Sequence, residues 1–165
     1  MTETVPEGWS DFFAANAGVA GALAGLIIVA ISVNVGTILK IPGMTSRAGA
    51  TVASLMLIVL SAAAALMPGQ GPQLLGGEIL LFTIVTLVLT VTAAVRMIRA
   101  AVPPYVAGTW VKSLLSLLAI VPFGIGAVIL LTGSYQGLYW VAAGFLLVFA
   151  ESVANAWVLL IEILR

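Results

Sequence analysis

Five long apolar stretches constrain this chain more than any other feature of its sequence. They cover about residues 12–39, 48–66, 74–95, 113–131 and 138–163. Crossing roughly 30 Å of bilayer hydrocarbon takes about 20 helical residues, so each stretch is long enough to span a membrane. The stretches are continuous rather than alternately apolar and polar, which predicts helices and not strands. The predicted fold class is therefore all-α: a polytopic transmembrane helical bundle with five spans.

The connections between these stretches leave no room for a soluble domain. Residues 67–72 and 132–136 are short turn sequences, which predict antiparallel neighbours in one bundle. The longer segment 97–112 contains Pro103 and Pro104, which end any helix carried over from the third stretch. Residues 1–165 thus predict a single integral membrane domain.

The basic residues are distributed on one side only. They are Lys40, Arg47, Arg96, Arg99, Lys112 and Arg165, and all lie after the first, third or fifth stretch. Lysine and arginine are normally retained on the cytoplasmic side, so we expect the N-terminus outside and the C-terminus inside. No basic residue precedes the first stretch, so it is expected to be retained rather than removed as a signal peptide. The expected location is the bacterial cytoplasmic membrane, with the lipid bilayer as the main partner.

The composition argues against most enzyme classes and against nucleic-acid binding. The chain has no cysteine and no histidine, which removes thiolate chemistry, imidazole bases and the usual zinc ligands. The only aspartate is Asp11, so no pair of aspartates is available for an intramembrane protease. Six basic residues balance six acidic ones, which leaves no positive field for nucleic acid. We therefore expect no catalytic residues, no metal, no cofactor and no nucleic-acid partner.

Glu151 carries the most chemical content, because it lies close to the centre of the fifth stretch and hence near the bilayer midplane. All six basic residues are expected at the membrane boundary, so no base is expected to meet its carboxyl group. A carboxyl group at this depth must be protonated, face water, hold a cation or accept several hydrogen bonds. Ionisable residues inside a membrane are functional by default, so Glu151 is the leading site candidate.

Other polar residues extend this candidate into a path through the membrane. Counted by depth, Thr86 is expected near Glu151 and Thr90 near Asn155. The candidates for an ion pathway beside Glu151 are Asn155, Thr86, Thr90, Asn16 and Asn34. The alternative is structural, since threonine often bonds its own helix backbone and asparagine often joins helices.

Two further patterns concern packing and motion. Gly18, Gly21 and Gly25 give the first stretch a small-residue face, which predicts either helix packing inside the chain or an oligomer interface. In the fourth stretch, Pro122 removes a backbone donor, and Gly124 and Gly126 soften the next turn. These three residues form a hinge candidate, the alternative being a fixed kink that only shapes the bundle.

Several short motifs carry a resemblance to a known protein family. They are Trp-Ser-Asp-Phe-Phe at 9–13, Gly-Leu-Ile-Ile-Val-Ala-Ile-Ser-Val-Asn at 25–34, Ile-Pro-Gly at 41–43 followed by Arg-Ala at 47–48, and Leu-Met-Pro-Gly-Gln at 66–70. On these motifs the first seventy residues resemble a family of small bacterial multi-span membrane proteins. Some members of that family are labelled modulators of the FtsH protease. The resemblance implies a multi-span fold and a regulatory role, and it implies no site residues.

With five spans and short loops, the membrane interior is the only place for a functional site. The leading hypothesis is a small oligomeric membrane channel or carrier that passes a small cation or proton past Glu151. No clear internal repeat is found, so a homo-oligomer is expected to supply any symmetry. The alternative is a non-catalytic membrane subunit or regulator of a larger membrane complex, such as a membrane protease, that docks through the glycine face of the first span.

Overall fold

The computed structural model describes residues 5–40, 43–100 and 106–161. The described part is all-α and contains six helices, which are α1 (Trp9–Val33), α2 (Val35–Ile38), α3 (Met44–Ala65), α4 (Pro72–Ala100), α5 (Val106–Leu131) and α6 (Gly137–Ile161). All except the short α2 are long and apolar enough to cross a membrane, which gives five candidate spans. The predicted fold class is thereby confirmed. Pro103, Pro104 and Arg165 lie outside the described residues.

α3, α4 and α5 each extend beyond the predicted span at the polar end of the helix. α4 continues to Ala100 and α5 begins at Val106, although the apolar stretches end near 95 and begin near 113. Helical hydrogen bonds do not require apolar side chains, so hydropathy marks the membrane-crossing part of a helix rather than its ends.

The first predicted span is interrupted near its end, which corrects the expectation of one helix to residue 39. α1 ends at Val33 and the short α2 begins at Val35, with Asn34 between them. Both the backbone N–H of Asn34, at 3.2 Å, and its side-chain Nδ2, at 3.0 Å, donate to the carbonyl of Ala30. Asparagine competes with regular helix bonding in this way, which explains why the helix stops inside an apolar sequence.

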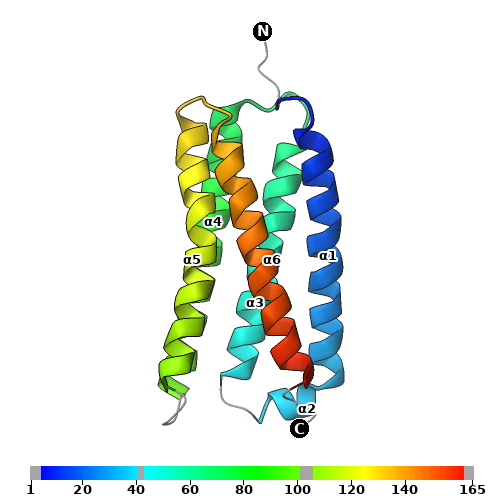
Figure 1. Cartoon of the computed structure of the whole chain (residues 1–165), viewed down its shortest axis with the longest axis vertical. Coiled ribbons are helices and arrows are strands. Elements are labelled where there is room, and N and C mark those ends of the chain that lie inside the picture. The colour runs from blue at the N-terminus through cyan, green and yellow to red at the C-terminus, as the bar shows by residue number, and fades with distance from the viewer. Residues whose placement is uncertain (1–4, 41–42, 101–105, 162–165) are drawn as a thin grey trace.

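The helices alternate in direction, so the bundle has two distinct ends (Figure 1). The turn end holds the start of α1 and the connections 66–71 and 132–136. Each connection contains a glycine with positive φ, 73° at Gly69 and 91° at Gly133, a conformation that other residues adopt only with strain. The basic end holds the end of α4, the starts of α3 and α5, and the described basic residues Lys40, Arg47, Arg96, Arg99 and Lys112.

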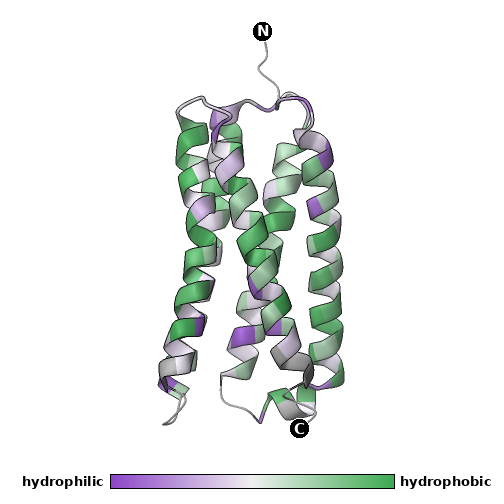
Figure 2. Ribbon diagram, viewed as in Figure 1, coloured by the Kyte–Doolittle hydropathy of each residue, from purple (hydrophilic) through white to green (hydrophobic). Residues whose placement is uncertain are grey.

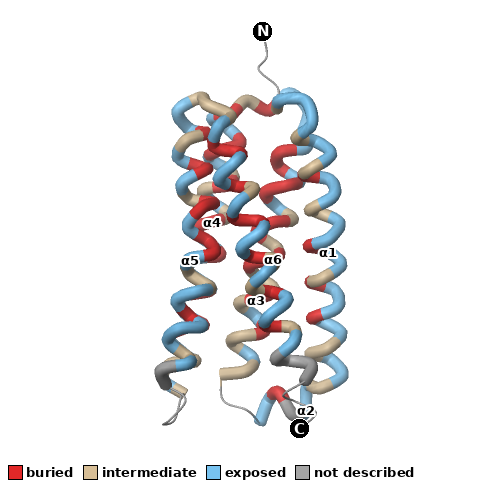
Figure 3. Tube along the Cα trace, in the orientation of Figure 1, coloured by how far each residue is buried: buried red, intermediate tan, exposed pale blue. Residues whose placement is uncertain are grey.

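α3 is the central helix of the bundle. It packs against α1, α4 and α6, while α5 packs between α4 and α6. In the most apolar part of each helix, 61% of the α3 residues are buried, compared with 17% of the α1 residues. Figure 3 shows the difference, with α1 exposed along most of its length. α1 is therefore a peripheral helix held mainly by α3.

The outer surface is strongly apolar, as Figure 2 shows by the hydropathy of each helix. Large apolar side chains are exposed on every long helix, among them Leu26, Leu60, Leu74, Leu114 and Leu146. A water-soluble protein would not expose so many apolar side chains together. This surface fits a multi-pass protein whose outer face meets lipid.

Aromatic packing closes the turn end. Trp9 meets Tyr139 edge to face with ring centroids 5.0 Å apart, and Phe12 stacks on Phe145 at 5.9 Å. Phe145 also contacts Phe123 at 5.5 Å, so the aromatic cluster joins α1, α5 and α6.

Candidate functional site

A cluster of hydrogen-bonded polar side chains joins α3, α5 and α6 inside the bundle. Its members are Arg47, Thr51, Ser116, Glu151 and Asn155, called here the polar cluster. Asn155 is its centre: Oδ1 accepts from Arg47 Nη2 at 2.7 Å and from Arg47 Nε at 3.1 Å. Its Nδ2 lies 2.9 Å from Glu151 Oε1 and 3.1 Å from Thr51 Oγ1. Asn155 therefore connects the guanidinium of Arg47 with the carboxyl group of Glu151.

The two oxygens of Glu151 have different surroundings. Oε1 accepts from Asn155 Nδ2 and also from the hydroxyl of Ser116 on α5. Oε2 is buried and has no hydrogen-bond partner among the described residues. One oxygen is thus held firmly, while the other is an unused polar position at which a proton or a cation can bind.

Helical spacing explains how the sequence places these groups. Glu151 and Asn155 are four residues apart on α6, and Arg47 and Thr51 are four residues apart on α3, so each pair shares one helix face. At 1.5 Å per residue from the turn end of their helices, Thr51, Ser116 and Glu151 all lie about 21–23 Å deep. Arg47 and Asn155 both lie about 27 Å deep. The members of the cluster therefore lie at two depths, and at each depth residues from different helices are level with one another.

Arg47 is linked to Glu151 through Asn155, which the sequence did not predict. The sequence predicts Arg47 at the membrane boundary, because the second apolar stretch starts at residue 48. In the structure α3 already begins at Met44, and the half-buried Arg47 turns toward Asn155 instead of toward solvent. The long arginine side chain reaches along the helix, so a boundary residue can still serve an interior site.

Further buried polar atoms surround the cluster. The hydroxyls of Thr90 on α4, Ser113 on α5 and Ser152 on α6 are buried without a partner among the described residues. Thr90 and Ser113 lie about 27 Å from the turn end, at the level of Arg47 and Asn155. Figure 2 shows hydrophilic positions on α3 and α6 in this half of the bundle. The polar groups are therefore concentrated in the half nearer the basic end.

The predicted pathway residues divide into two groups. Thr86 and Thr90 are buried on α4, at the depths of Glu151 and Asn155, although α4 packs against α3 and α5. Asn16 and Asn34 lie on or next to α1, where each amide donates to its own helix, to Phe12 at 2.7 Å and to Ala30 at 3.0 Å. The structure brings Asn155 to Glu151 and does not bring the two α1 asparagines there.

The packing candidates also lie in different environments. Gly18, Gly21 and Gly25 are exposed, and a Cβ atom at any of them would meet nothing within 4 Å. Their face therefore contacts no helix among the described residues of this chain. Pro122 is buried within a continuous α5. A Cβ at Gly124 would lie 4.0 Å from Cγ2 of Thr83 on α4, which is ordinary contact. Gly126 is tightly packed, since its Cβ would come within 2.6 Å of the Gly137 carbonyl.

The sequence analysis missed Arg47, Thr51 and Ser116 as members of the site. Counting depth from the turn end places Thr51 and Ser116 level with Glu151, just as it places Thr86 there. That signal was present in the sequence. The inward direction of Arg47 was not, because it depends on where α3 begins and on which helix lies beside it.

Comparison with known protein families, with curated proteins and with solved structures finds no match. The function is therefore argued from the polar cluster itself.

Proposed function

We propose that this protein is a small membrane carrier or channel that moves protons or a small cation through the membrane past Glu151. The observation that carries the proposal is the carboxyl group of Glu151, which lies deep in an apolar bundle with Oε1 bonded twice and Oε2 buried without a partner. A carboxyl group placed in this way is costly, and inside membranes such groups mark proton and ion routes.

Within this proposal the proton is the preferred species. Asn155 bonds both the positive guanidinium of Arg47 and the carboxyl group of Glu151, and a positive charge this close opposes the binding of a metal cation. A proton needs only one oxygen and no coordination shell, so Glu151 Oε2 alone can accept it. Protonation removes the negative charge from the Arg47–Asn155–Glu151 chain and changes what holds α6 against α3.

A carrier fits the packing better than a permanently open channel. Between Glu151 and the turn end, the interior is filled by large buried apolar side chains such as Leu55, Ile79, Phe123 and Phe145. A proton that reaches Glu151 from the basic end meets this apolar packing next, so onward transfer requires a movement of the helices. The hinge candidate, formed by Pro122, Gly124 and Gly126, lies in this part of α5.

The proposal includes a bacterial cytoplasmic membrane with the basic end facing the cytoplasm, because lysine and arginine are retained there. It also includes a homo-oligomer that associates through the exposed glycine face of α1. No catalytic step is proposed for any residue.

The deciding experiment measures flux in liposomes that contain the purified full-length protein. An imposed pH gradient and a potassium diffusion potential drive proton, sodium or potassium movement, which is followed with an internal pH dye and with ion-selective dyes. We expect wild-type flux above that of protein-free liposomes and loss of this excess in Glu151→Gln, which keeps the side-chain shape and removes the ionisable group. Glu78→Gln is the matched control, because Glu78 is bonded to Gln70 near the turn end and lies outside the polar cluster.

Two results would overturn the transport proposal. One is a wild-type protein that passes none of the three ions, and the other is equal flux in the wild type and in Glu151→Gln. Gel filtration and circular dichroism of both variants show whether the comparison is made on folded protein.

A second function is favoured by the exposed surface of α1. Its glycine face contacts no other helix among the described residues, which fits a non-catalytic subunit or regulator that docks on a larger membrane complex, such as a membrane protease. Under this alternative the polar cluster only fixes the bundle, and Gln at position 151 is tolerated because it also donates and accepts hydrogen bonds.

A further inference from the structure

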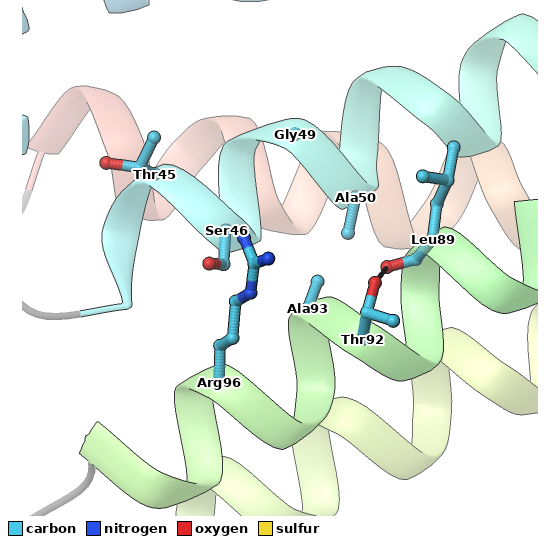
Figure 4. A pocket seen from close by; sticks show the side chains of 8 residues that line it. All are labelled: Thr45, Ser46, Gly49, Ala50, Leu89, Thr92, Ala93 and Arg96. Carbon is cyan, nitrogen blue, oxygen red and sulfur yellow. Dashed lines mark hydrogen bonds between the residues drawn. The ribbon is translucent and has the colours of Figure 1, made fainter.

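A groove runs between α3 and α4 near the basic end, on the outer surface of the bundle and separate from the polar cluster. Its volume is about 260 Å³, and its lining residues are Thr45, Ser46, Gly49, Ala50, Leu89, Thr92, Ala93 and Arg96. Five of these eight residues are exposed, so the groove opens outward rather than into the bundle. Figure 4 shows Ala50, Ala93, Leu89 and Arg96 between the two helices, with Thr45 at the start of α3.

The groove has a polar end and an apolar end. Thr45 and Ser46 lie in the first turn of α3, and Arg96 lies in the last turns of α4, about 6 Å before Ala100. Further into the bundle the lining changes to Gly49, Ala50, Leu89 and Ala93. Small residues on the facing sides of the helices leave the space open. The polar end lies at the depth of lipid headgroups, and the apolar end lies at the depth of acyl chains.

Arg96 is available to a ligand at the polar end. Its side chain extends from α4 across the groove toward Ser46 on α3 (Figure 4). Among the described residues it has no hydrogen-bond or ion-pair partner, and it is exposed. The adjacent first turn of α3 adds amide groups and a helix dipole that favour negative charge. This end of the groove therefore attracts an anion.

The surface around Arg96 carries further positive charges. Lys40, Arg99 and Lys112 lie at the basic end with Arg96. Of the acidic residues that the structure describes, Glu7, Asp11 and Glu78 lie in the turn half, and Glu151 lies inside the bundle in the polar cluster rather than at the groove. An anionic headgroup is thus favoured locally by Arg96 and more broadly by this end of the protein.

We propose that this groove binds one anionic phospholipid of the surrounding bilayer. Its phosphate accepts hydrogen bonds from the Arg96 guanidinium and from the hydroxyls of Thr45 and Ser46. One acyl chain lies along Gly49, Ala50 and Ala93. The volume is below the ~300–1,000 Å³ typical of sites that enclose a whole small molecule, so part of one lipid fills the groove while the rest stays in the bilayer. The proposal is independent of transport through Glu151.

The test is native mass spectrometry of the full-length protein in detergent, titrated with phosphatidylglycerol, which is anionic, or with phosphatidylcholine, which is zwitterionic. We expect one phosphatidylglycerol to bind more tightly than phosphatidylcholine. Arg96→Gln should weaken the binding of phosphatidylglycerol about fivefold or more, the effect of one basic residue near a lipid headgroup. Arg99→Gln is the matched control, because Arg99 is exposed on the same helix at the same end and does not line the groove.

A second variant tests the acyl-chain part without changing charge. A Cβ at Gly49 would meet nothing within 4 Å, and Gly49 lines the groove, so the side chain of Gly49→Leu is expected to extend into the groove. It should weaken phosphatidylglycerol binding while the thermal unfolding of the lipid-free protein stays unchanged.

Four results would overturn the lipid site. Equal weakening by Arg96→Gln and Arg99→Gln would mean diffuse attraction to the basic end. Equal binding of the two lipids would remove the role of charge. Unchanged binding in Gly49→Leu would leave the groove without an acyl chain. Displacement of the lipid by inorganic phosphate would reduce the site to a simple anion site.

Discussion

The two halves of this bundle are held together by different means. In the turn half, aromatic rings and glycines bring helices into close contact, and a Cβ at Gly76 would already lie 2.8 Å from the carbonyl of Ala127. In the basic half, the helices are joined by the polar cluster, and the carboxyl oxygen Oε2 of Glu151 and the hydroxyls of Thr90, Ser113 and Ser152 have no partner among the described residues. The turn half relies mainly on close packing, although Gln70 there bonds Glu78 and Tyr135, and the Ser61 hydroxyl is buried without a partner among the described residues. The basic half relies mainly on hydrogen bonds.

The difference shows where a membrane bundle can change its structure. Lipid provides no hydrophobic force between helices, so close packing of small residues is what fixes the turn half. Polar groups without partners are costly when buried, and they gain from any rearrangement or ligand that satisfies them. We therefore expect the turn half to act as the anchor and the basic half to be the part that responds to protons, ions or lipid.

The largest effect on the unfolding free energy is expected from disrupting the close helix packing of the turn half. Gly76→Ala places a Cβ against backbone atoms of α5, which cannot rotate away, and should lower the free energy of unfolding by about 3 kcal/mol. Gly77→Ala is the matched control, because nothing lies within 4 Å of its Cβ, and it should gain up to about 1 kcal/mol from helix propensity. Unfolding in mixed detergent, followed by circular dichroism, measures both. Equal effects at the two neighbours would show that the turn half is not closely packed.

A smaller loss is expected from breaking the polar half. Asn155→Leu removes the acceptor of Arg47 and one donor to Glu151, and should cost about 2 kcal/mol because these two half-buried polar groups lose the side chain that bonds both. Adding Glu151→Gln to Asn155→Leu should cost less than the sum of the single changes, since both belong to one network. Asn16→Leu is the control, because Asn16 bonds only its own helix and should change the unfolding free energy by less than about 0.5 kcal/mol. Strict additivity of the first pair would contradict the network.

The smallest effect on the unfolding free energy is expected at the exposed glycine face of α1, which contacts no other helix among the described residues. Gly21→Leu meets open space, so the unfolding free energy of the monomer should stay within about 0.5 kcal/mol of the wild type. If α1 joins copies of the chain, the same change should shift the protein to smaller assemblies in gel filtration with light scattering. Leu26→Ala, at an exposed position about 100° around α1 from Gly25, should leave the assembly intact. A wild-type protein that is monomeric from the start would favour the regulatory-subunit alternative.

Much of the architecture could be predicted from apolar length alone. The turns near 67–72 and 132–136 agree with the observed ends of α3 and α5 within about two residues, because hydrocarbon thickness sets how long each helix must be. The interruption at Asn34 could not be predicted in this way, since it depends on a local side-chain bond to Ala30 inside an apolar sequence.

For the site, the sequence identified Glu151 and Asn155 as a pair on one helix face, and the structure joins them by a hydrogen bond of 2.9 Å. It could not identify Arg47 as their partner. Depth along the membrane follows from counting residues at 1.5 Å each, but direction around the helix axis depends on which helices become neighbours. The same limit applies to Asn16 and Asn34. Both are polar residues in an apolar stretch, as a pathway needs, but each amide bonds the backbone one turn earlier and not the polar cluster.

The glycines show what the sequence alone determined and what depended on the tertiary structure. By itself the sequence determined that small residues occur in the first and fourth spans, and that a carboxyl group must be stabilised at the centre of the fifth. Only the tertiary structure decided that Gly76 and Gly126 make the close contacts while Gly18, Gly21 and Gly25 face outward. The physical reason is that every helix in lipid has several apolar faces of similar cost to expose, so shape and hydrogen bonds between particular helices, and not hydrophobicity, select the face that is buried.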